Sequence, residues 1–178
     1  GRDNHSRYND NRGNLNIDFL RLEQPETRLL DALLHDYQID AVLDLHESST
    51  QKKILTLSQG YLVNPGAQYE VGNNPNLYPA LLNFGQKKLL PELIQLTQKN
   101  GLKSEHYHGE ILQLGQPVGH GGLKLSNFRN YSAIHGLFSV LVENPLDPKA
   151  GHYATPGNIA KRMEKQFICI LSFLELLK

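Results

Sequence analysis

The stretch "AVLDLHESS" (residues 41–49) decides the fold, because an apolar, β-branched run of this kind predicts a buried strand in the middle of a sheet. The run ends in His46 and Glu47 and contains Asp44, so one imidazole and two carboxylates lie within four positions. A strand end that reaches water is one explanation. A metal site is the other, because open α/β sheets bind their ligands at the carboxyl ends of the strands.

Helical and strand patterns alternate on both sides of this strand. A helix is predicted over residues 25–37, where Pro25 suits the first turn and apolar side chains recur on one face: Leu30, Leu33, Leu34 and Tyr37. Residues 53–63 predict one or two further strands. The next segment, 64–76, is dense in Asn, Gly and Pro and predicts a loop.

The second half continues the alternation. A helix is predicted over 76–100, interrupted by Pro79 and Pro91 and closed at Asn100 and Gly101, where an αL cap is expected. A strand near 105–114, a glycine-rich loop, a short helix near 127–135 and the apolar strand "LFSVLVE" follow. The last helix is expected to start at Thr155 and Pro156 and to bury one apolar face, made of Ile159, Met163, Phe167, Ile170, Leu174 and Leu177.

Strands that alternate with helices predict an α/β fold with a mixed, largely parallel central sheet flanked by helices. The 178 residues contain no internal repeat and no linker-like segment, so we expect a single domain over 1–178.

Composition argues against several classes of partner. With 18 basic and 18 acidic residues the chain has no net charge, so neither nucleic acid nor a membrane surface is expected to bind it. No segment has the run of apolar residues that a bilayer-spanning helix needs. The single cysteine, Cys169, has no partner for an intramolecular disulfide and is expected to be a buried thiol. Compartment and oligomeric state stay open.

Two strand ends suggest hydrolytic chemistry. His46 and Glu143 each close a predicted strand, and the ends of neighbouring strands can converge on one crevice. Neutral imidazole is the commonest zinc ligand, and a carboxylate beside a zinc-bound water is the usual general base of metallohydrolases. A solvated histidine and a turn-capping glutamate would be the structural alternative.

The polar segment before the first helix strengthens the catalytic interpretation. It concentrates guanidinium and amide groups, which bind carboxylates and stabilise oxyanions: Arg7, Asn9, Asn11, Arg12, Asn14 and Asn16. A solvated loop is again the alternative. The order of this segment, a helix and then the strand that ends at His46 favours a functional loop.

In these motifs the chain resembles the later part of a zinc carboxypeptidase of the carboxypeptidase A type. The family has an Arg-x-Asn motif, a glycine-containing turn and then Asp-Leu-Asn-Arg with an aromatic residue, and the corresponding stretch here is "RYNDNRGNLNIDF" (7–19). The stretches "PETRLL" (25–30), "LDLHES" (43–48) and "FSVLVEN" (138–144) match further family motifs in the same order.

The resemblance implies a zinc-dependent hydrolase that cleaves a peptide or an N-acyl amino acid. It implies that His46 binds Zn²⁺, that Glu143 is the general base and acid, that Arg7 stabilises the oxyanion and that Asn16 contacts the terminal carboxylate of the substrate. Tyr131 is the candidate for the tyrosine that the family places over its active site.

The sequence departs from the family at two points. The other two zinc ligands of the family belong to a His-x-x-Glu motif upstream of the arginine loop, so the chain is expected to be the C-terminal portion of the domain, inactive and without tight zinc binding alone. Ile17 replaces the arginine that binds the substrate carboxylate, and Arg12 and Arg129 are the candidates for its role. An amidohydrolase of the aspartoacylase or succinylglutamate desuccinylase type and a catalytically inactive binding module are the alternatives.

Overall fold

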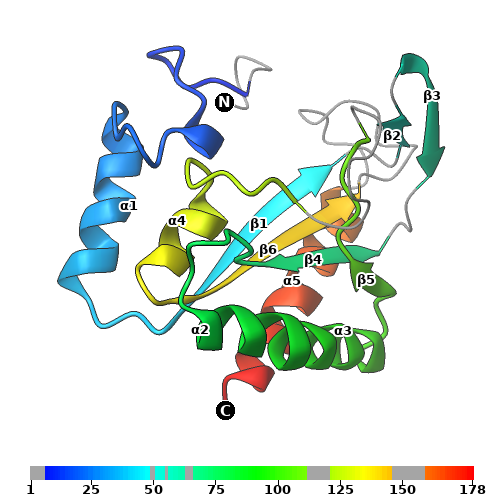
Figure 1. Ribbon diagram of the computed structural model, residues 1–178. Helices are drawn as coiled ribbons and strands as arrows, with labels where there is room; N and C mark the ends of the chain where they lie inside the picture. Colours follow the sequence, from blue (N-terminus) through cyan, green and yellow to red (C-terminus); the bar gives the residue numbers. More distant parts are fainter. Residues whose placement is uncertain (1–6, 49–50, 55, 63–65, 112–120, 146–158) are drawn as a thin grey trace.

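The computed structural model describes residues 7–48, 51–54, 56–62, 66–111, 121–145 and 159–178 (Figure 1). Along the chain the elements are η1 (Leu15–Ile17), α1 (Pro25–Asp36), β1 (Ala41–Ser48), β2 (Gln51–Ile54), β3 (Thr56–Leu62), β4 (Ala67–Val71), α2 (Pro79–Phe84), η2 (Gly85–Leu89), α3 (Leu90–Lys99), β5 (Ser104–His106), α4 (Phe128–Ile134), β6 (Phe138–Pro145) and α5 (Ile159–Leu176). The expected start of the last helix at Thr155 and Pro156 lies outside the described residues.

The centre of the fold is a four-stranded sheet in the order β1-β6-β4-β5. β1 is parallel to β6 and β4 is parallel to β5, whereas β4 and β6 are antiparallel. The predicted mixed, largely parallel sheet flanked by helices is therefore confirmed. The two strands expected within 53–63 form a separate antiparallel pair, β2 and β3, drawn at the upper right of Figure 1.

The core fills one face of this sheet. Alternate residues of the central strands point into it, because successive side chains of a strand face opposite sides. α3 and α5 pack on each other and against the strands on this side. The buried core consists of Ala67, Tyr69, Val71, Leu89, Leu90, Leu93, Val140, Val142, Cys169 and Phe173. The expected burial of Cys169 is confirmed.

β4 corrects one expectation, since it lies in the segment predicted to be a loop. Its five residues are all buried, with Tyr69 and Val71 in the core and Gln68 and Glu70 on the opposite face. The turn-forming residues that surround this short strand dominate the local composition. Pairing with β6 and β5 on both sides supplies the hydrogen bonds that hold so short a segment in the sheet.

α5 corrects a second expectation. The face predicted to be buried is largely exposed, and Met163 and Phe167 are 64% and 60% exposed. The helix buries Lys165, Cys169, Ser172 and Phe173 instead. Apolar residues lie on more than one face of this helix, so periodicity alone did not identify the packed face. No described helix combines the length and hydropathy needed to cross a bilayer.

The remaining helices lie where the sequence predicts them. α1 begins at Pro25, and the long helix expected over 76–100 is a continuous run of α2, a π-helical turn and α3. Gly101 follows with φ of 89°, the left-handed conformation expected for its cap. α4 is capped by the side chain of Asn127, which accepts a hydrogen bond from the backbone of Asn130.

The segment before α1 is anchored to that helix by Asp18. Its carboxylate accepts hydrogen bonds from the backbone amides of Glu23 and Gln24 and from the hydroxyl of Thr27, in the first turn of α1. Thr27 is the only buried residue of α1. The apolar residues that predicted the helix are mostly exposed, and Leu29 and Tyr37 are 62% and 64% exposed.

Candidate functional site

A row of polar residues crosses the sheet on the face opposite the core. The strand register pairs His46 of β1 with Glu143 of β6, Glu143 with Gln68 of β4, and Gln68 with Glu105 of β5. Partners in register point to the same face, so the four side chains form one line across four strands. His46 and Glu143, predicted to converge from two strand ends, therefore lie side by side near the carboxyl ends of β1 and β6.

Asp44 orients the imidazole of His46. The Nε2 atom of His46 lies 2.9 Å from Oδ1 of Asp44, and this contact leaves Nδ1 as the other ring nitrogen. Burial works against protonation of His46, but the hydrogen bond to Asp44 and the charges of Asp44 and Glu143 outweigh it and raise the pKa of His46. An imidazole held by a carboxylate is the usual arrangement of a metal-binding histidine.

Glu47, the neighbour of His46, has a structural role. Arg162 of α5 donates two hydrogen bonds to its carboxylate, with distances of 2.7 and 2.6 Å. This bidentate ion pair ties the end of β1 to α5. The paired carboxylates of the opening stretch thus divide their tasks, one supporting His46 and the other supporting the helix.

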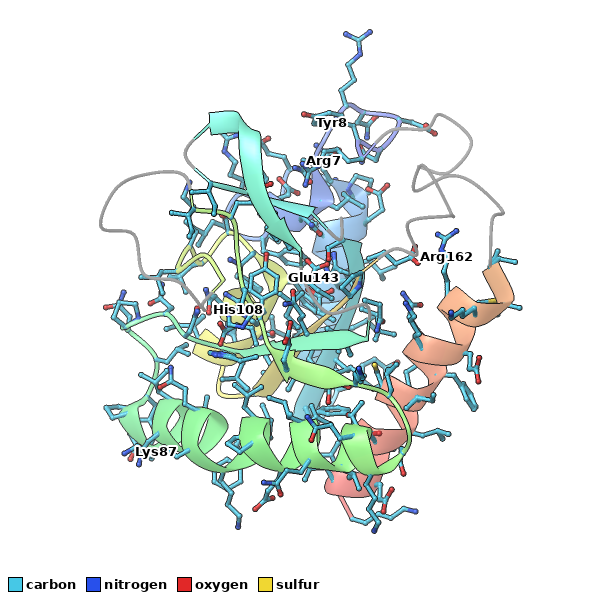
Figure 2. All side chains as sticks on the ribbon, turned by 90° about the vertical axis from the view of Figure 1, so that its right-hand side faces the viewer. Arg7, Tyr8, Lys87, His108, Glu143 and Arg162 are labelled. Atoms are coloured by element: carbon cyan, nitrogen blue, oxygen red, sulfur yellow. The ribbon has the colours of Figure 1, made fainter. Side chains whose placement is uncertain are left out.

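Glu143 is a carboxylate in an unfavourable environment. Burial raises its pKa, although the nearby charges of His46 and Lys52 lower it. Its Oε2 atom is buried and has no hydrogen-bond partner among the described residues. A buried, incompletely paired carboxylate with a raised pKa is suited to proton transfer near neutral pH. Figure 2 shows Glu143 in the middle of the molecule.

Lys52 of β2 is a cation of this site that the sequence did not reveal. It is 6% exposed, and burial lowers its pKa against the opposing effect of Glu143 and Glu110. Its ammonium group also lies 5.3 Å from the centre of the Tyr107 ring. No motif marks this lysine, because a pairing between the hairpin and the main sheet brings it here: Ile54 forms a bridge with Ile111.

Arg129 of α4 is buried rather than open to solvent, with 3% exposure. Its Nη2 donates to the side chain of Asn73 at 3.0 Å and to the carbonyl of Gly122 at 2.7 Å. Burial lowers its pKa, while the charges of Glu70, Tyr107, Asp44 and Glu143 act in the opposite direction. Its Nε is buried without a partner in the described part of the chain.

The other predicted site residues lie apart from this row in the described structure. Arg7, Arg12 and Asn16 are exposed residues of the N-terminal segment, which Figure 2 shows above Glu143. Among the described residues, no hydrogen bond or ion pair joins them to His46 or Glu143. Ile17, where the resemblance would place an arginine, is 55% exposed.

Tyr131 faces α1. Its hydroxyl donates a hydrogen bond to Asp31, and its ring packs against Phe19 and His135. Burial, the hydrogen bond and the charge of Asp31 raise the pKa of Tyr131 to about 12, so the hydroxyl stays a donor. The structure thus pairs Tyr131 with α1.

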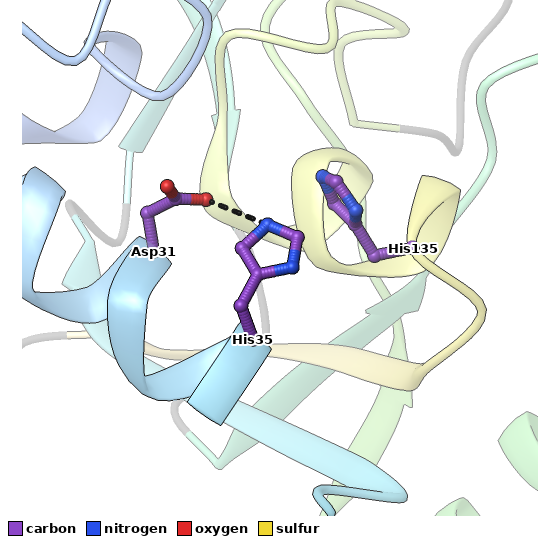
Figure 3. Close-up of side chains that lie close together, drawn as sticks. All are labelled: Asp31, His35 and His135. Atoms are coloured by element: carbon purple, nitrogen blue, oxygen red, sulfur yellow. Dashed lines mark ion pairs between the residues drawn. The ribbon is translucent and has the colours of Figure 1, made fainter. Parts of the chain in front are cut away.

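The same region contains a second group of metal-ligating side chains. Asp31, His35 and His135 each offer a ligand atom, and these atoms all lie within 4.8 Å of one another (Figure 3). We did not single out these residues in the sequence. The signal was the spacing of Asp31 and His35, four positions apart on a predicted helix, which puts both on one face.

The comparisons with known proteins bear on the fold. No family model matches the sequence, and no curated protein matches it. A solved structure that is similar to this chain is a metallo-carboxypeptidase from Pseudomonas aeruginosa in complex with (2-guanidinoethylmercapto)succinic acid, with a TM-score of 0.59 and 16% sequence identity. The alignment covers 96% of this chain and 42% of that chain. The chain therefore has a metallo-carboxypeptidase-like fold over less than half the length of that protein.

Proposed function

We propose that the chain is the C-terminal part of a zinc-dependent hydrolase that cleaves a peptide or amide bond near a carboxylate. The observation that supports this proposal most is the placement of His46 beside Glu143 at the carboxyl ends of two parallel strands. The chain covers 42% of the similar metallo-carboxypeptidase, so the activity and substrates of a whole protein are part of the proposal.

The residues at this sheet edge suit one protein ligand of a zinc ion and a general base. His46 would bind the ion through the ring nitrogen that Asp44 does not engage. Catalytic zinc normally has three protein ligands, so His46 alone would hold the ion weakly. In the proposed domain the remaining ligands come from an upstream His-x-x-Glu motif.

The bound ion would supply a water molecule of lowered pKa and polarise the substrate carbonyl. Glu143 then accepts a proton from the attacking water and returns it to the leaving amine nitrogen, as a buried carboxylate of raised pKa can. Asp44 keeps the imidazole of His46 in one orientation and tautomer. Lys52 and Arg129 keep positive charge near Glu143.

The substrate side of the proposal rests on the N-terminal segment and α4. Arg7 would stabilise the oxyanion and Asn16 would contact the substrate carboxylate. Arg12 or Arg129 would replace the arginine that Ile17 lacks, and Tyr131 would complete the substrate site. Arg12 is the better candidate for direct contact, because it is exposed whereas Arg129 is bound to Asn73 and Gly122.

The test uses the full-length gene product and compares its wild type with His46→Ala. The wild type should contain stoichiometric zinc and hydrolyse a blocked dipeptide, and the variant should lose both. Elemental analysis that finds unchanged zinc in the variant would refute the assignment of His46. A variant at a second histidine of the same face, His108→Ala, controls for general loss of metal.

Ile17 favours a second candidate, an amidohydrolase without strict C-terminal specificity. Isoleucine cannot make the bidentate contact by which arginine binds a carboxylate. A paired assay on a free-acid peptide and its C-terminal amide separates the two. Cleavage of the acid alone supports the carboxypeptidase, and equal cleavage of both supports the broader enzyme. A protein that binds the peptide without cleaving either substrate is the binding module.

A further inference from the structure

The contact between α1 and α4 has the composition of a transition-metal site. Asp31 and His35 come from successive turns of α1, and His135 is the residue at which α4 ends (Figure 3). Two imidazoles and one carboxylate are donors that suit zinc, copper and nickel, whereas magnesium and calcium prefer oxygen ligands alone.

The distances match those around one metal ion. Nε2 of His35 lies 3.4 Å from Oδ1 of Asp31, longer than the usual N–H···O hydrogen bond of about 2.9–3.0 Å. Two ligand atoms at about 2.0 and 2.1 Å from a tetrahedral zinc ion lie about 3.3 Å apart. The rings of His35 and His135 meet edge to face with centroids 5.0 Å apart, and both side chains are exposed enough to turn.

The carboxylate is already held in place by a neighbour. Tyr131 donates its hydroxyl hydrogen to Asp31 from the same helix that carries His135. Partners of this kind orient metal ligands and are a regular part of metal sites. Asp31 is only partly exposed, so its carboxylate is preorganised between the two helices.

This group is distinct from the row that contains His46 and Glu143. α1 and α4 lead into the amino ends of β1 and β6, whereas His46 and Glu143 lie near the carboxyl ends of the same strands. At about 3.3 Å per residue, the two places are roughly 15 Å or more apart.

We propose that Asp31, His35 and His135 form a binding site for a divalent transition-metal ion of the zinc class, which fastens α1 to α4. With three protein ligands and a water molecule the ion would be four-coordinate. Fastening matters here because Thr27 is the only residue of α1 that is buried, so the helix has little apolar packing of its own. The proposal does not depend on the function proposed for His46.

The test is titration of the metal-free 178-residue chain with zinc chloride, followed by calorimetry. One ion per chain should bind, and magnesium chloride should not replace it. His35→Gln and His135→Gln should each weaken binding by more than about 100-fold, because loss of a ligand exceeds the 10- to 100-fold cost of losing an orienting partner. Tyr131→Phe should fall within that smaller range, and His46→Ala should bind as the wild type does.

A second measurement guards against variants that misfold. Zinc should shift the imidazole NMR signals of His35 and His135 in the wild-type chain and slow hydrogen exchange of α1. Zinc binding that survives both glutamine variants, or that His46→Ala abolishes, would overturn the proposal. Absence of binding by the folded wild-type chain would overturn it as well and leave an ordinary ion pair between Asp31 and His35.

Discussion

His46 and Glu143 are direct neighbours across the parallel strands β1 and β6, with their side chains on the polar face of the sheet. Parallel neighbours must come from separate parts of the chain, since a crossover connects them. The pair therefore forms only when the sheet is complete, and both residues occupy the position at which open sheets bind ligands.

Glu143→Gln should lower kcat of the full-length hydrolase by about 10² to 10⁴ without lowering its stability. The wild-type Oε2 is buried without a hydrogen-bond partner among the described residues, and such a group costs about 1–3 kcal/mol. Removal of its charge should leave the free energy of unfolding equal or higher. Glu105→Gln, at the far end of the same row, is the control. Wild-type turnover in Glu143→Gln would place the base elsewhere.

Asp18→Asn should destabilise the chain and flatten its response to acid. Burial raises the pKa of Asp18, but hydrogen bonds from Thr27, Gln24 and Glu23 and the charge of Arg21 outweigh it and leave the pKa lowered. A lowered pKa stabilises the fold above the unfolded value of about 4 and loses that effect as the pH falls through the folded pKa. Urea unfolding at pH 7 should show a loss of about 2 kcal/mol that disappears below pH 3. A constant difference at all pH values would contradict this account.

Arg129→Met should cost about 3 kcal/mol or more of unfolding free energy, because it leaves the buried carboxylate of Glu70 and the amide oxygen of Asn73 without their cation. Arg21→Met is the matched control. Arg21 is 72% exposed and 3.6 Å from Glu23, so its loss should change stability by less than about 1 kcal/mol. Equal stability of the two variants would show that Arg129 is free for substrate binding.

Gly66→Ala should prevent correct pairing of β4 with β5. A Cβ atom at this glycine would lie 1.6 Å from the backbone oxygen of Lys103, which cannot move without breaking its hydrogen bond to Ala67. Gly122→Ala meets no atom within 4 Å and is the control. Thermal unfolding should separate the two variants by several degrees, since about 1 kcal/mol shifts Tm by about 2–8 °C. A Gly66→Ala protein as stable as the control would contradict the described approach of the two backbones.

Local patterns in the sequence predicted most of the elements and failed where packing decides. α1, the α2 to α3 run and β6 followed from period, proline and glycine. β4 was missed because its five residues are held by two neighbouring strands, which the sequence around it does not show. The packed face of α5 was misassigned because the helix carries apolar residues on more than one side.

The candidate site was predictable only in part for the same reason. His46 and Glu143 have sequence signals, since each closes an apolar strand. Lys52 has none, because its position depends on how the β2–β3 hairpin meets the main sheet. The pairing of Tyr131 with Asp31 joins two helices that are far apart in the chain and could not be anticipated from either.

The wide separation of β1 and β6 along the chain has a consequence for the order of folding. The α2 to α3 run needs only nearby residues, and its helices can form early, whereas the β1–β6 pair must first close a long loop. A partly folded chain would have its helices but not the row from His46 to Glu105. Chemistry at this row is thereby restricted to molecules that have completed folding, and the exchange protection of the β6 amides reports that completion.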